Sequence, residues 1–498
     1  MTIRYISTRD TQPVPDILAF DEVLLKGLAP DGGLYAPISI PRLPTAIERS
    51  RLSAAEQPSQ HHSTRRGPPS TSQQTHQPHR TAFTYPELAT QIIAAYTTNI
   101  IPDEHLKSMV FDAYSSFRHP NICPLVAIAE NHYLLELFHG PTFAFKDVGL
   151  QLVARLFDYE LNRRNSRVMI IGATSGDTGS AAMRAVAGLP RVEIVMLYPS
   201  ERISEIQRRQ MTTLTASNVH AIAIDGTFDD CQDLVKAMFA DEHFRAELQL
   251  AAVNSINWAR IVAQIVYYVW SYYQLGENQA VTFCVPTGNF GNILAGHYAR
   301  RMGLNINRLL SASNANDILS RFFANGSLSA REVVATLSPS MDIQISSNLE
   351  RLLFEIFDFD GNATSALINE FRSTGRASLT PKQHDQLRTG FQGDRLTDQE
   401  TLEVMAGVHA DTGLTIDPHT AVAVGVAQKQ QRIHPDELII TLATAHPAKF
   451  PDAVASATGK TPNMPAPLAA LEHKKERRVS LPKDLAAVQS FVRSVRNS

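Results

Sequence analysis

One lysine of this sequence has neighbours that could make its amine reactive. Lys146 follows the aromatic-rich run 143–145 and precedes Asp147 in the stretch HGPTFAFKD (139–147). Apolar surroundings disfavour the charged ammonium, so the amine of such a lysine can attack an aldehyde and form a Schiff base. Most lysines keep the charged head in water instead, and the stretch alone leaves both interpretations open. We expect Asp147 to pair with another residue or to hold the turn.

A glycine-containing turn is the second feature whose residues could take part in chemistry. The stretch PTGNFGN (286–292) directly follows the apolar run VTFCV and precedes a predicted helix. Gly288 and Gly291 allow a tight turn, and a helix start offers unpaired N–H groups and the positive end of a dipole. Together these features suit a phosphate ester, although a purely structural turn has the same pattern. No Gly-Lys-Ser/Thr follows, which disfavours a nucleotide-binding P-loop.

The stretch GATSGDTGS (172–180) is a second candidate anion site between a strand and a helix. Thr174, Ser175 and Thr178 add hydroxyl donors to the N–H groups of this loop. The same loop residues, or Asp177, could instead cap the helix, and capping does not exclude ligand binding. Because two similar loops occur in one chain, we favour ligand binding.

An alternation of apolar strands and amphipathic helices must position these stretches. This alternation predicts parallel sheets with helices on their faces. Ligands of α/β proteins bind at the carboxyl ends of the strands, where both loops are expected to lie. The strands are predicted at 167–173, 192–199, 220–226, 250–253, 281–288 and 437–444, and the helices at 178–186, 204–214, 229–239, 256–273 and 292–301.

Length and composition limit the possible function classes. The chain has 498 residues, enough for two or three domains. It contains 44% hydrophobic and 19% charged residues, typical of a globular protein. A net charge of −3 argues against a general binder of nucleic acid or membrane surfaces. The apolar runs are too short to span a membrane, and the N-terminus lacks an apolar signal core, so we expect a cytoplasmic protein.

The three cysteines are scattered along the chain. Cys123, Cys231 and Cys284 show no CxxC spacing. They therefore predict reduced thiols rather than a disulfide framework or a zinc site, and we expect no metal centre.

The segment 56–80 has a different composition from the rest of the chain. Its sequence, EQPSQHHSTRRGPPSTSQQTHQPHR, contains no aliphatic or aromatic residue. Because such a segment cannot bury apolar surface, we expect a disordered surface loop. Its four histidines could bind a metal, but a solvated low-complexity insert is the more typical explanation. Helices predicted at 82–96 and 103–114 complete a small N-terminal region, and the segment after 450 predicts a surface helix and a basic tail.

Five stretches occur in an order that is characteristic of one enzyme family. They are HGPTFAFKD, GATSGDTGSAA, NSINWARI, VPTGNFGN and TAHPAKF, with DGGLYAP (31–37) before them. Together they resemble the threonine synthase family of the long, fungal and enterobacterial kind. The resemblance extends from about Ile3 to Phe450 and is interrupted by the segment 56–80.

The resemblance implies a fold and a domain organisation. The fold is α/β, that of a fold-type-II pyridoxal-phosphate (PLP) enzyme similar to the tryptophan synthase β chain. It has two parallel-sheet α/β domains and a small N-terminal region. The implied parts are the N-terminal region (1–115), a large PLP-binding domain (116–165 and 275–460), a small domain (166–274) and a C-terminal tail (461–498).

The resemblance also assigns roles to residues. It implies that Lys146 carries PLP and is the catalytic residue. The other implied cofactor-binding residues are Gly288, Asn289, Phe290 and Asn292 at the cofactor phosphate, and Thr444 at the pyridine nitrogen. The implied substrate-binding residues are Thr174, Ser175, Asp177, Thr178, Asn254, Ser255, Asn257 and Arg260.

Two of these residues carry charges with open interpretations. Many relatives in the wider superfamily have Asn where this chain has Asp177, and the charge of Asp177 could repel substrate anions. Arg260 is suited to bind the substrate phosphate with two parallel N–H bonds. It could instead form a structural ion pair on its helix.

The implied activity converts O-phosphohomoserine and water into threonine and phosphate, the last step of threonine biosynthesis. A PLP-dependent phospho-lyase that gives 2-oxobutyrate is the alternative on the same scaffold. A non-catalytic binding protein with this fold is disfavoured because Lys146, the phosphate loop and Arg260 occur together. We expect a small-molecule substrate, no nucleic-acid or membrane partner, and a monomer or homodimer.

Overall fold

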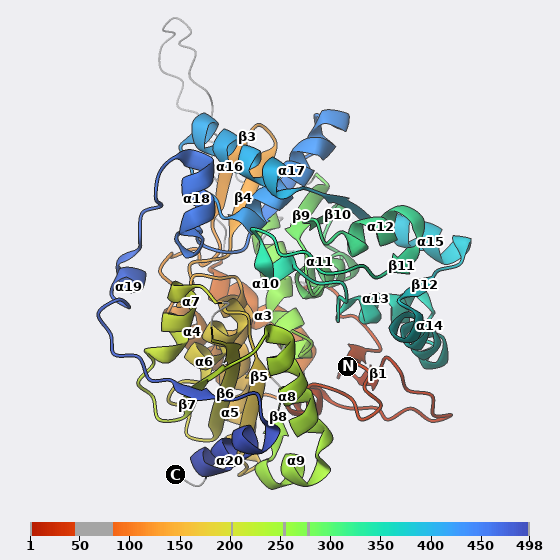
Figure 1. The fold of residues 1–498 in the computed structure, drawn as a ribbon. Helices are drawn as coiled ribbons and strands as arrows, with labels where there is room; N and C mark the ends of the chain where they lie inside the picture. The colour runs from red at the N-terminus through yellow and green to blue at the C-terminus, as the bar shows by residue number, and fades with distance from the viewer. Residues whose placement is uncertain (1, 45–82, 201–202, 252–254, 276–278, 497–498) are drawn as a thin grey trace, which may run out of the picture.

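Two β-sheets organise the molecule. The computed structural model describes residues 2–44, 83–200, 203–251, 255–275 and 279–496. A six-stranded sheet has the order β13-β10-β9-β14-β4-β3, and a five-stranded sheet has the order β15-β7-β6-β5-β8. Figure 1 shows the larger sheet in the upper half of the molecule and the smaller sheet in the lower half. The predicted loop 56–80 and Asn254 lie outside the described residues.

The larger sheet contains the strands that carry the lysine stretch and the phosphate loop. Its strands are parallel, except that β3 is antiparallel to β4. The alternation of strands and helices in the sequence predicted parallel sheets. The exception arises because only Glu130 and Asn131 connect β3 to β4, and a two-residue connection permits only an antiparallel pair. The strands are β3 (Leu125–Ala129), β4 (His132–Glu136), β9 (Val281–Pro286), β10 (Ile306–Ser313), β13 (Phe391–Arg395) and β14 (Ile439–Ala443).

The smaller sheet is parallel throughout. Its central strands are apolar runs with buried residues on both faces, as expected of a parallel sheet that helices cover. The strands are β5 (Val168–Ala173), β6 (Val192–Pro199), β7 (Val219–Ile224), β8 (Leu250–Ala251) and β15 (Val479–Leu481). The helices of this half are α6 (Asp177–Val186), α7 (Glu205–Thr212), α8 (Phe228–Ala240), α9 (Glu242–Leu248) and α20 (Leu485–Arg496).

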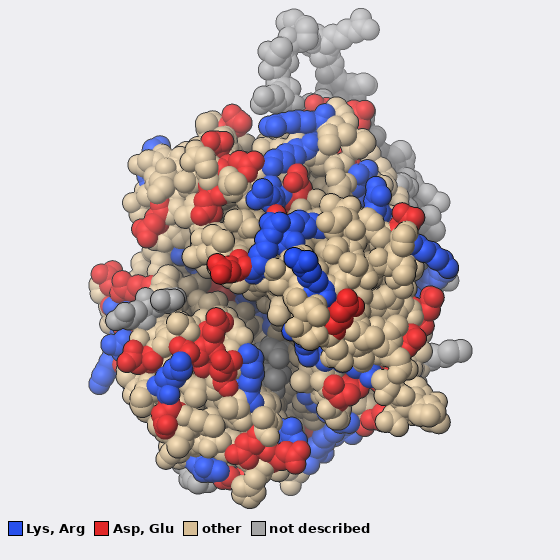
Figure 2. Space-filling model, turned by 45° about the vertical axis from the view of Figure 1, so that its right-hand side comes forward, with Lys and Arg blue, Asp and Glu red and all other residues tan. Residues whose placement is uncertain are grey.

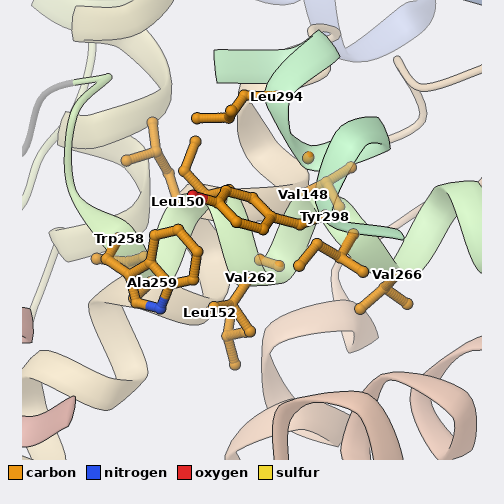
Figure 3. Packing of buried hydrophobic residues seen from close by; sticks show 14 of the residues in the cluster. Val148, Leu150, Leu152, Trp258, Ala259, Val262, Val266, Leu294 and Tyr298 are labelled. Carbon is orange, nitrogen blue, oxygen red and sulfur yellow. The ribbon is translucent and has the colours of Figure 1, made fainter. Parts of the chain in front are cut away.

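Three helices pack together in the centre of the molecule. They are α5 (Lys146–Arg163), α10 (Trp258–Leu275) and α11 (Gly291–Arg301). Lys146, Arg260 and Asn292 lie in their first turns, so this packing fixes the three side chains relative to one another. Figure 3 shows the apolar contacts, which involve Val148, Leu150 and Leu152 of α5, Trp258, Ala259, Val262 and Val266 of α10, and Leu294 and Tyr298 of α11.

The N-terminal region packs against these central helices. The expected helices of this region are confirmed as α3 (Tyr85–Thr97) and α4 (Asp103–Ser115). Buried aromatic rings join the region to α10, because Tyr5 and Tyr96 both contact Trp258. The remaining elements of the region are β1 (Tyr5–Ser7), α1 (Phe20–Lys26) and β2 (Tyr35–Pro37).

The remaining helices surround the larger sheet. Helices α12 to α15, with β11 and β12, form an arm on the right of Figure 1, and α16 to α18 lie at the top. These elements are α12 (Ile318–Asn325), β11 (Ser327–Ser329), α13 (Leu349–Ile356), α14 (Gly361–Thr374), β12 (Arg376–Ser378), α15 (Pro381–Arg388), α16 (Asp398–Thr412), α17 (Pro418–Ile433) and α18 (Pro451–Thr458).

The C-terminal segment, which the sequence analysis expected to be a surface helix and tail, is part of the small sheet's half. After α19 (Ala466–Ala469) the chain descends along the molecule (Figure 1). Strand β15 then pairs with β7 at the sheet edge. In α20, Val488 and Val492 are fully buried in a cluster with residues of β7 and α8.

Two further findings concern the cysteines and the helices. Cys123, Cys231 and Cys284 are buried free thiols. Among the helices that the structure describes, none has both the length and the apolar character needed to cross a membrane.

Candidate active site

The lysine stretch and Thr444 lie at the carboxyl ends of neighbouring parallel strands, β4 and β14. The two segments are joined directly, because the backbone N–H of Phe145 donates to the carbonyl of Thr444 at 2.8 Å. Asp147 holds the turn, as expected, since its carboxylate accepts hydrogen bonds from the backbone N–H (2.7 Å) and the hydroxyl (2.8 Å) of Thr142. Lys146 therefore projects from a fixed loop.

Lys146 is a buried lysine, with 10% of its side chain exposed. Burial lowers the pKa of its ammonium, while Asp177, whose Oδ2 lies 3.2 Å from Nζ, raises it. The cations Lys449 and Arg260 lower the pKa further, and the net direction is downward. This is the direction that frees an amine for nucleophilic or base chemistry.

Asp177 is bound by positive and neutral donors rather than left facing the cleft as a free anion. Its Oδ1 accepts from Lys449 Nζ at 2.6 Å and from Gln207 Nε2 at 2.8 Å. Burial alone would raise the pKa of the carboxyl, but Lys449 and Lys146 outweigh it and hold the pKa well below its usual range. The repulsion of substrate anions that the sequence left open is therefore offset by two ammonium groups.

Lys449 was not assigned a role from the sequence, although it lies in the stretch TAHPAKF. Its side chain is fully buried. Besides Asp177, its ammonium donates to the carbonyl of Thr142 at 3.0 Å. The only available signal was a lysine inside an apolar motif, the same signal that identified Lys146.

The loop 286–292 has the geometry of an anion cradle. Phe290 takes a left-handed conformation (φ 64°) and leads directly into α11. A Cβ at Gly288 would lie 2.6 Å from the carbonyl oxygen of Ser340, so a larger residue would clash there. Residues 288–292 line the cleft at the start of α11, and the free N–H groups of a helix start suit a phosphate.

Asn292 has one buried polar atom available for a ligand. Its Oδ1 accepts hydrogen bonds from the hydroxyls of Tyr267 and Tyr268. Its Nδ2 is buried, and no partner is present within the described part of the chain. An unsatisfied buried donor is costly, so this amide fits a cofactor phosphate beside it.

No motif in the sequence identified the residues that support this loop from behind. Ser346 donates to the carbonyl of Gly288 at 2.6 Å. Asn348 donates to the carbonyls of Asn289 (3.1 Å) and Ser255 (3.0 Å), and Arg351 donates to Asn348 Oδ1. These contacts connect the phosphate loop to the segment that leads into α10.

The loop after β5 uses part of its polar groups internally. Thr174 Oγ1 accepts from the N–H groups of Gly176 (3.0 Å) and Gly179 (2.9 Å), so this hydroxyl stabilises the loop. Ser175 is exposed. Of the predicted residues in this loop, Asp177 and Thr178 line the cleft.

Arg260 is a buried cation that faces the cleft. It is 4% exposed, and burial lowers the pKa of its guanidinium to about 10. Its Nη1 has no hydrogen-bond partner and the side chain forms no ion pair, as far as the chain is described. The alternative of a structural ion pair on α10 is thus without support in this structure.

Of two residues that precede Arg260, Ser255 and Asn257, one faces the cleft and the other binds backbone groups. Ser255 lines the cleft. The side chain of Asn257 stabilises the fold, because it donates to the carbonyl of Leu24 at 2.9 Å and accepts from the N–H of Ala259 at 3.0 Å. Asn254 lies outside the described residues.

One cleft brings most of the predicted residues together. Thr174, Ser175 and Asn257 are not part of its lining. The predicted residues in the lining are Lys146, Asp177, Thr178, Ser255, Arg260, Gly288, Asn289, Phe290, Asn292 and Thr444, and those that sequence reasoning missed include Gln264, Ser340 and His419.

His419 has a defined orientation in this cleft. Its Nδ1 lies 2.8 Å from Asp417 Oδ1, and its Nε2 accepts from the backbone N–H of Ser340 at 3.2 Å. Both ring nitrogens are thus occupied, with the proton on Nδ1. His419 therefore fixes the segment around Ser340, which faces the phosphate loop.

Comparison with known proteins matches three family models to the chain. They describe the threonine synthase N terminus (residues 4–56), a pyridoxal-phosphate dependent enzyme (125–371) and the threonine synthase C-terminal part (420–492). A threonine synthase of Pseudomonas aeruginosa is 44% identical over 98% of both chains.

Solved structures give the same result. The chain is similar to a PLP-bound threonine synthase from Brucella melitensis, with 44% identity, full coverage of both chains and a TM-score of 0.90. It is also similar to threonine synthase from yeast, with 36% identity, coverage of 99% and 98%, and a TM-score of 0.88.

Proposed function

The chain belongs to the threonine synthase family, and from this premise we propose that it converts O-phospho-L-homoserine and water into L-threonine and phosphate. The observation that carries the proposal is the cleft itself. A buried lysine, a phosphate loop and an unpaired buried arginine line the same cavity. Such a set suits a substrate with two anionic groups and a cofactor with one phosphate.

The residues present fit PLP. Lys146 provides the buried amine, and the loop 288–292 with the unpartnered Asn292 Nδ2 provides the phosphate site. The hydroxyl of Thr444 would contact the pyridine nitrogen without imposing a charge on it. When bound, the cofactor withdraws electrons from the carbon skeleton of the substrate.

The protein's own residues supply binding and proton transfer. Lys146 Nζ accepts the proton from Cα of the substrate, and a second proton leaves Cβ as the phosphate departs from Cγ. Protons then return to Cγ and, at the end, to Cα. Arg260 binds the substrate phosphate ester through its fork of N–H groups. Water adds at Cβ to complete threonine.

We also propose the cytoplasm as the site of action and a monomer or homodimer as the working form. The three buried free cysteines support a reducing compartment.

Replacement of the lysine tests the proposal. We expect Lys146→Ala to abolish threonine formation from O-phosphohomoserine and to leave a folded protein, because the amine of Lys146 serves the reaction rather than the stability of the fold. The measurement is threonine, 2-oxobutyrate and phosphate release, together with the absorbance of bound PLP and circular dichroism. The exposed lysine variant Lys460→Ala is the control and should keep full activity.

Two results would contradict the proposal. Turnover of Lys146→Ala close to that of the wild type would remove the lysine from the mechanism. Release of 2-oxobutyrate as the main product by the wild type would establish the phospho-lyase alternative.

A further inference from the structure

Three buried side chains form a chain of charges behind the cleft. Asp177 lies between two lysines, with Oδ1 at 2.6 Å from Lys449 Nζ and Oδ2 at 3.2 Å from Lys146 Nζ. All three side chains are at least nine-tenths buried. One carboxylate therefore shares two ammonium groups in a region from which water is largely excluded.

The three residues come from both halves of the molecule. Asp177 begins α6, in the half of the smaller sheet, and Gln207 of α7 donates to the same carboxylate at 2.8 Å. Lys146 and Lys449 follow β4 and β14 of the larger sheet. The arrangement thus joins the two halves of the molecule beside the cleft.

Among the residues that the structure describes, few other charged or titratable groups lie near this cluster. Arg260 faces Lys146 from α10 and lowers the pKa of its ammonium. Asp147, beside Lys146, is turned away toward Thr142, and Lys449 acts on it as a cation. His419 also lines the cleft, with both ring nitrogens occupied.

We propose that Lys449 is a positioning residue that binds Asp177 and thereby lets Lys146 lose its proton, which sets the pH range in which Lys146 takes up the cofactor and transfers protons. The inference rests on the proposed role of Lys146 as the PLP lysine. It assigns a function to a residue that does not itself line the cleft.

The sign of the effect follows from the charges. Asp177 alone would hold Lys146 as an ammonium, because an opposite charge at this distance favours the charged form. Lys449 counteracts this in two ways, since it engages the carboxylate and repels a second ammonium nearby. Without Lys449, Asp177 would hold the proton on Lys146 to a higher pH.

Attachment of the cofactor to the apoprotein reports this directly. Lys146 Nζ and the aldehyde carbon of PLP form a C=N bond and release one water, and this step requires the neutral amine. The rate of attachment to the apoprotein, followed by absorbance over a range of pH, therefore gives a midpoint for the proton on Lys146.

We expect Lys449→Met to raise this midpoint by about 1–3 pH units, the usual effect of one close charge. Asp177→Asn should lower it, and the double variant should return it toward the wild-type value. Lys449→Arg, which keeps the charge, should stay closer to the wild type than Lys449→Met. The exposed lysine variant Lys460→Met should leave the midpoint unchanged.

Thermal unfolding of each apoprotein separates this role from a purely structural one. A lower melting temperature of Lys449→Met with an unchanged midpoint would overturn the inference, as would single shifts that do not cancel in the double variant. If Lys449→Met does not fold, the midpoints of Lys449→Arg and of the double variant are compared with that of the wild type. A midpoint of the double variant far from the wild-type value would overturn the inference.

A different result would count against the proposed function instead. If Lys146→Ala attaches PLP as the wild type does, Lys146 is not the cofactor lysine. If the wild type attaches PLP through Lys146 but Lys449 has no influence on the midpoint, only the present inference fails.

Discussion

Arg260 illustrates what a single side chain in this cleft must accomplish. A buried cation without a partner is costly, because the desolvation of the charge is not compensated. Arg260 is held in this state by the packing of α10, with one nitrogen unpartnered among the described residues. Such a cost at the wall of a cleft is explained if a ligand anion supplies the missing partner.

The substitution Arg260→Lys keeps the charge but loses the fork of N–H groups. A charge-assisted hydrogen bond contributes roughly 1.5–3 kcal/mol. We therefore expect kcat/KM for O-phosphohomoserine to fall on the order of ten- to a hundredfold, from ~1.4 kcal/mol per factor of ten. Cofactor binding should persist, because in our proposal the separate loop 288–292 holds the cofactor phosphate.

Steady-state kinetics and a PLP titration check this prediction. Arg184→Lys, on the exposed surface of α6, is the matched control and should behave as the wild type. Loss of PLP with normal substrate binding would show that Arg260 serves cofactor binding or the fold. Unchanged kinetics would show that the substrate phosphate binds elsewhere.

The sequence indicated residue types better than it indicated their partners. Lys146 and Arg260 were identified because their types and motifs suggest chemistry. Thr174 and Asn257 have equally suitable types, but threonine and asparagine bind backbone groups as readily as ligands, and here they bind backbone. The role of Lys449 depends on its distance from Asp177, which lies 272 positions earlier in the numbering and is brought close only by folding.

At the scale of elements, long apolar runs were predictable and short pairings were not. The strands and helices in the middle of the chain are present where the alternation of apolar and polar residues predicted them. Strand β15 has three residues and no distinctive pattern, and α20 buries only Val488 and Val492. A surface helix has much the same spacing, so the sequence predicted a tail where the structure forms a sheet edge.

A substitution in α20 tests this packing. Val488→Ala removes two methyl groups from a fully buried position, which costs ~1.6 kcal/mol at ~0.8 kcal/mol per group, plus the cost of any cavity. We expect a lower midpoint of urea unfolding for the small-sheet half. Ser490→Ala, exposed on the same helix, is the control, and equal effects of the two substitutions would contradict the packing.

At the scale of the whole molecule, the two sheets face one cleft and each contributes different charges to it. Lys146 follows β4 of the larger sheet, Asp177 begins α6 in the half of the smaller sheet, and Arg260 comes from the central helix α10. Lys449, which follows β14, lies behind Asp177. Figure 2 shows Lys and Arg interspersed with Asp and Glu on the visible face. In the cleft, the cations Lys146 and Arg260 are available to an anionic ligand.

Deletion of residues 56–80 tests whether the rest of the molecule depends on this segment. We expect activity and melting temperature to change little, because the segment has no aliphatic or aromatic residue to add to a core. The length-dependent part of loop closure is ~0.6 kcal/mol per doubling. A Gly/Ser segment of equal length separates the effects of length and composition, and a loss of several degrees in both variants would show that the native segment is needed.

The position of β15 has a consequence for how the protein is made. A ribosome completes β5, β6, β7 and α8 long before it reaches residues 479–496. Until then β7 is an open edge strand, and the apolar surface later covered by α20 is exposed to other nascent chains. An mRNA with a stop codon shortly before this stretch would yield a truncated polypeptide. That polypeptide would contain every residue of the cleft but would leave β7 as an unpaired, aggregation-prone edge strand. We expect cellular quality control to remove such a product by proteolysis before it can accumulate as enzyme.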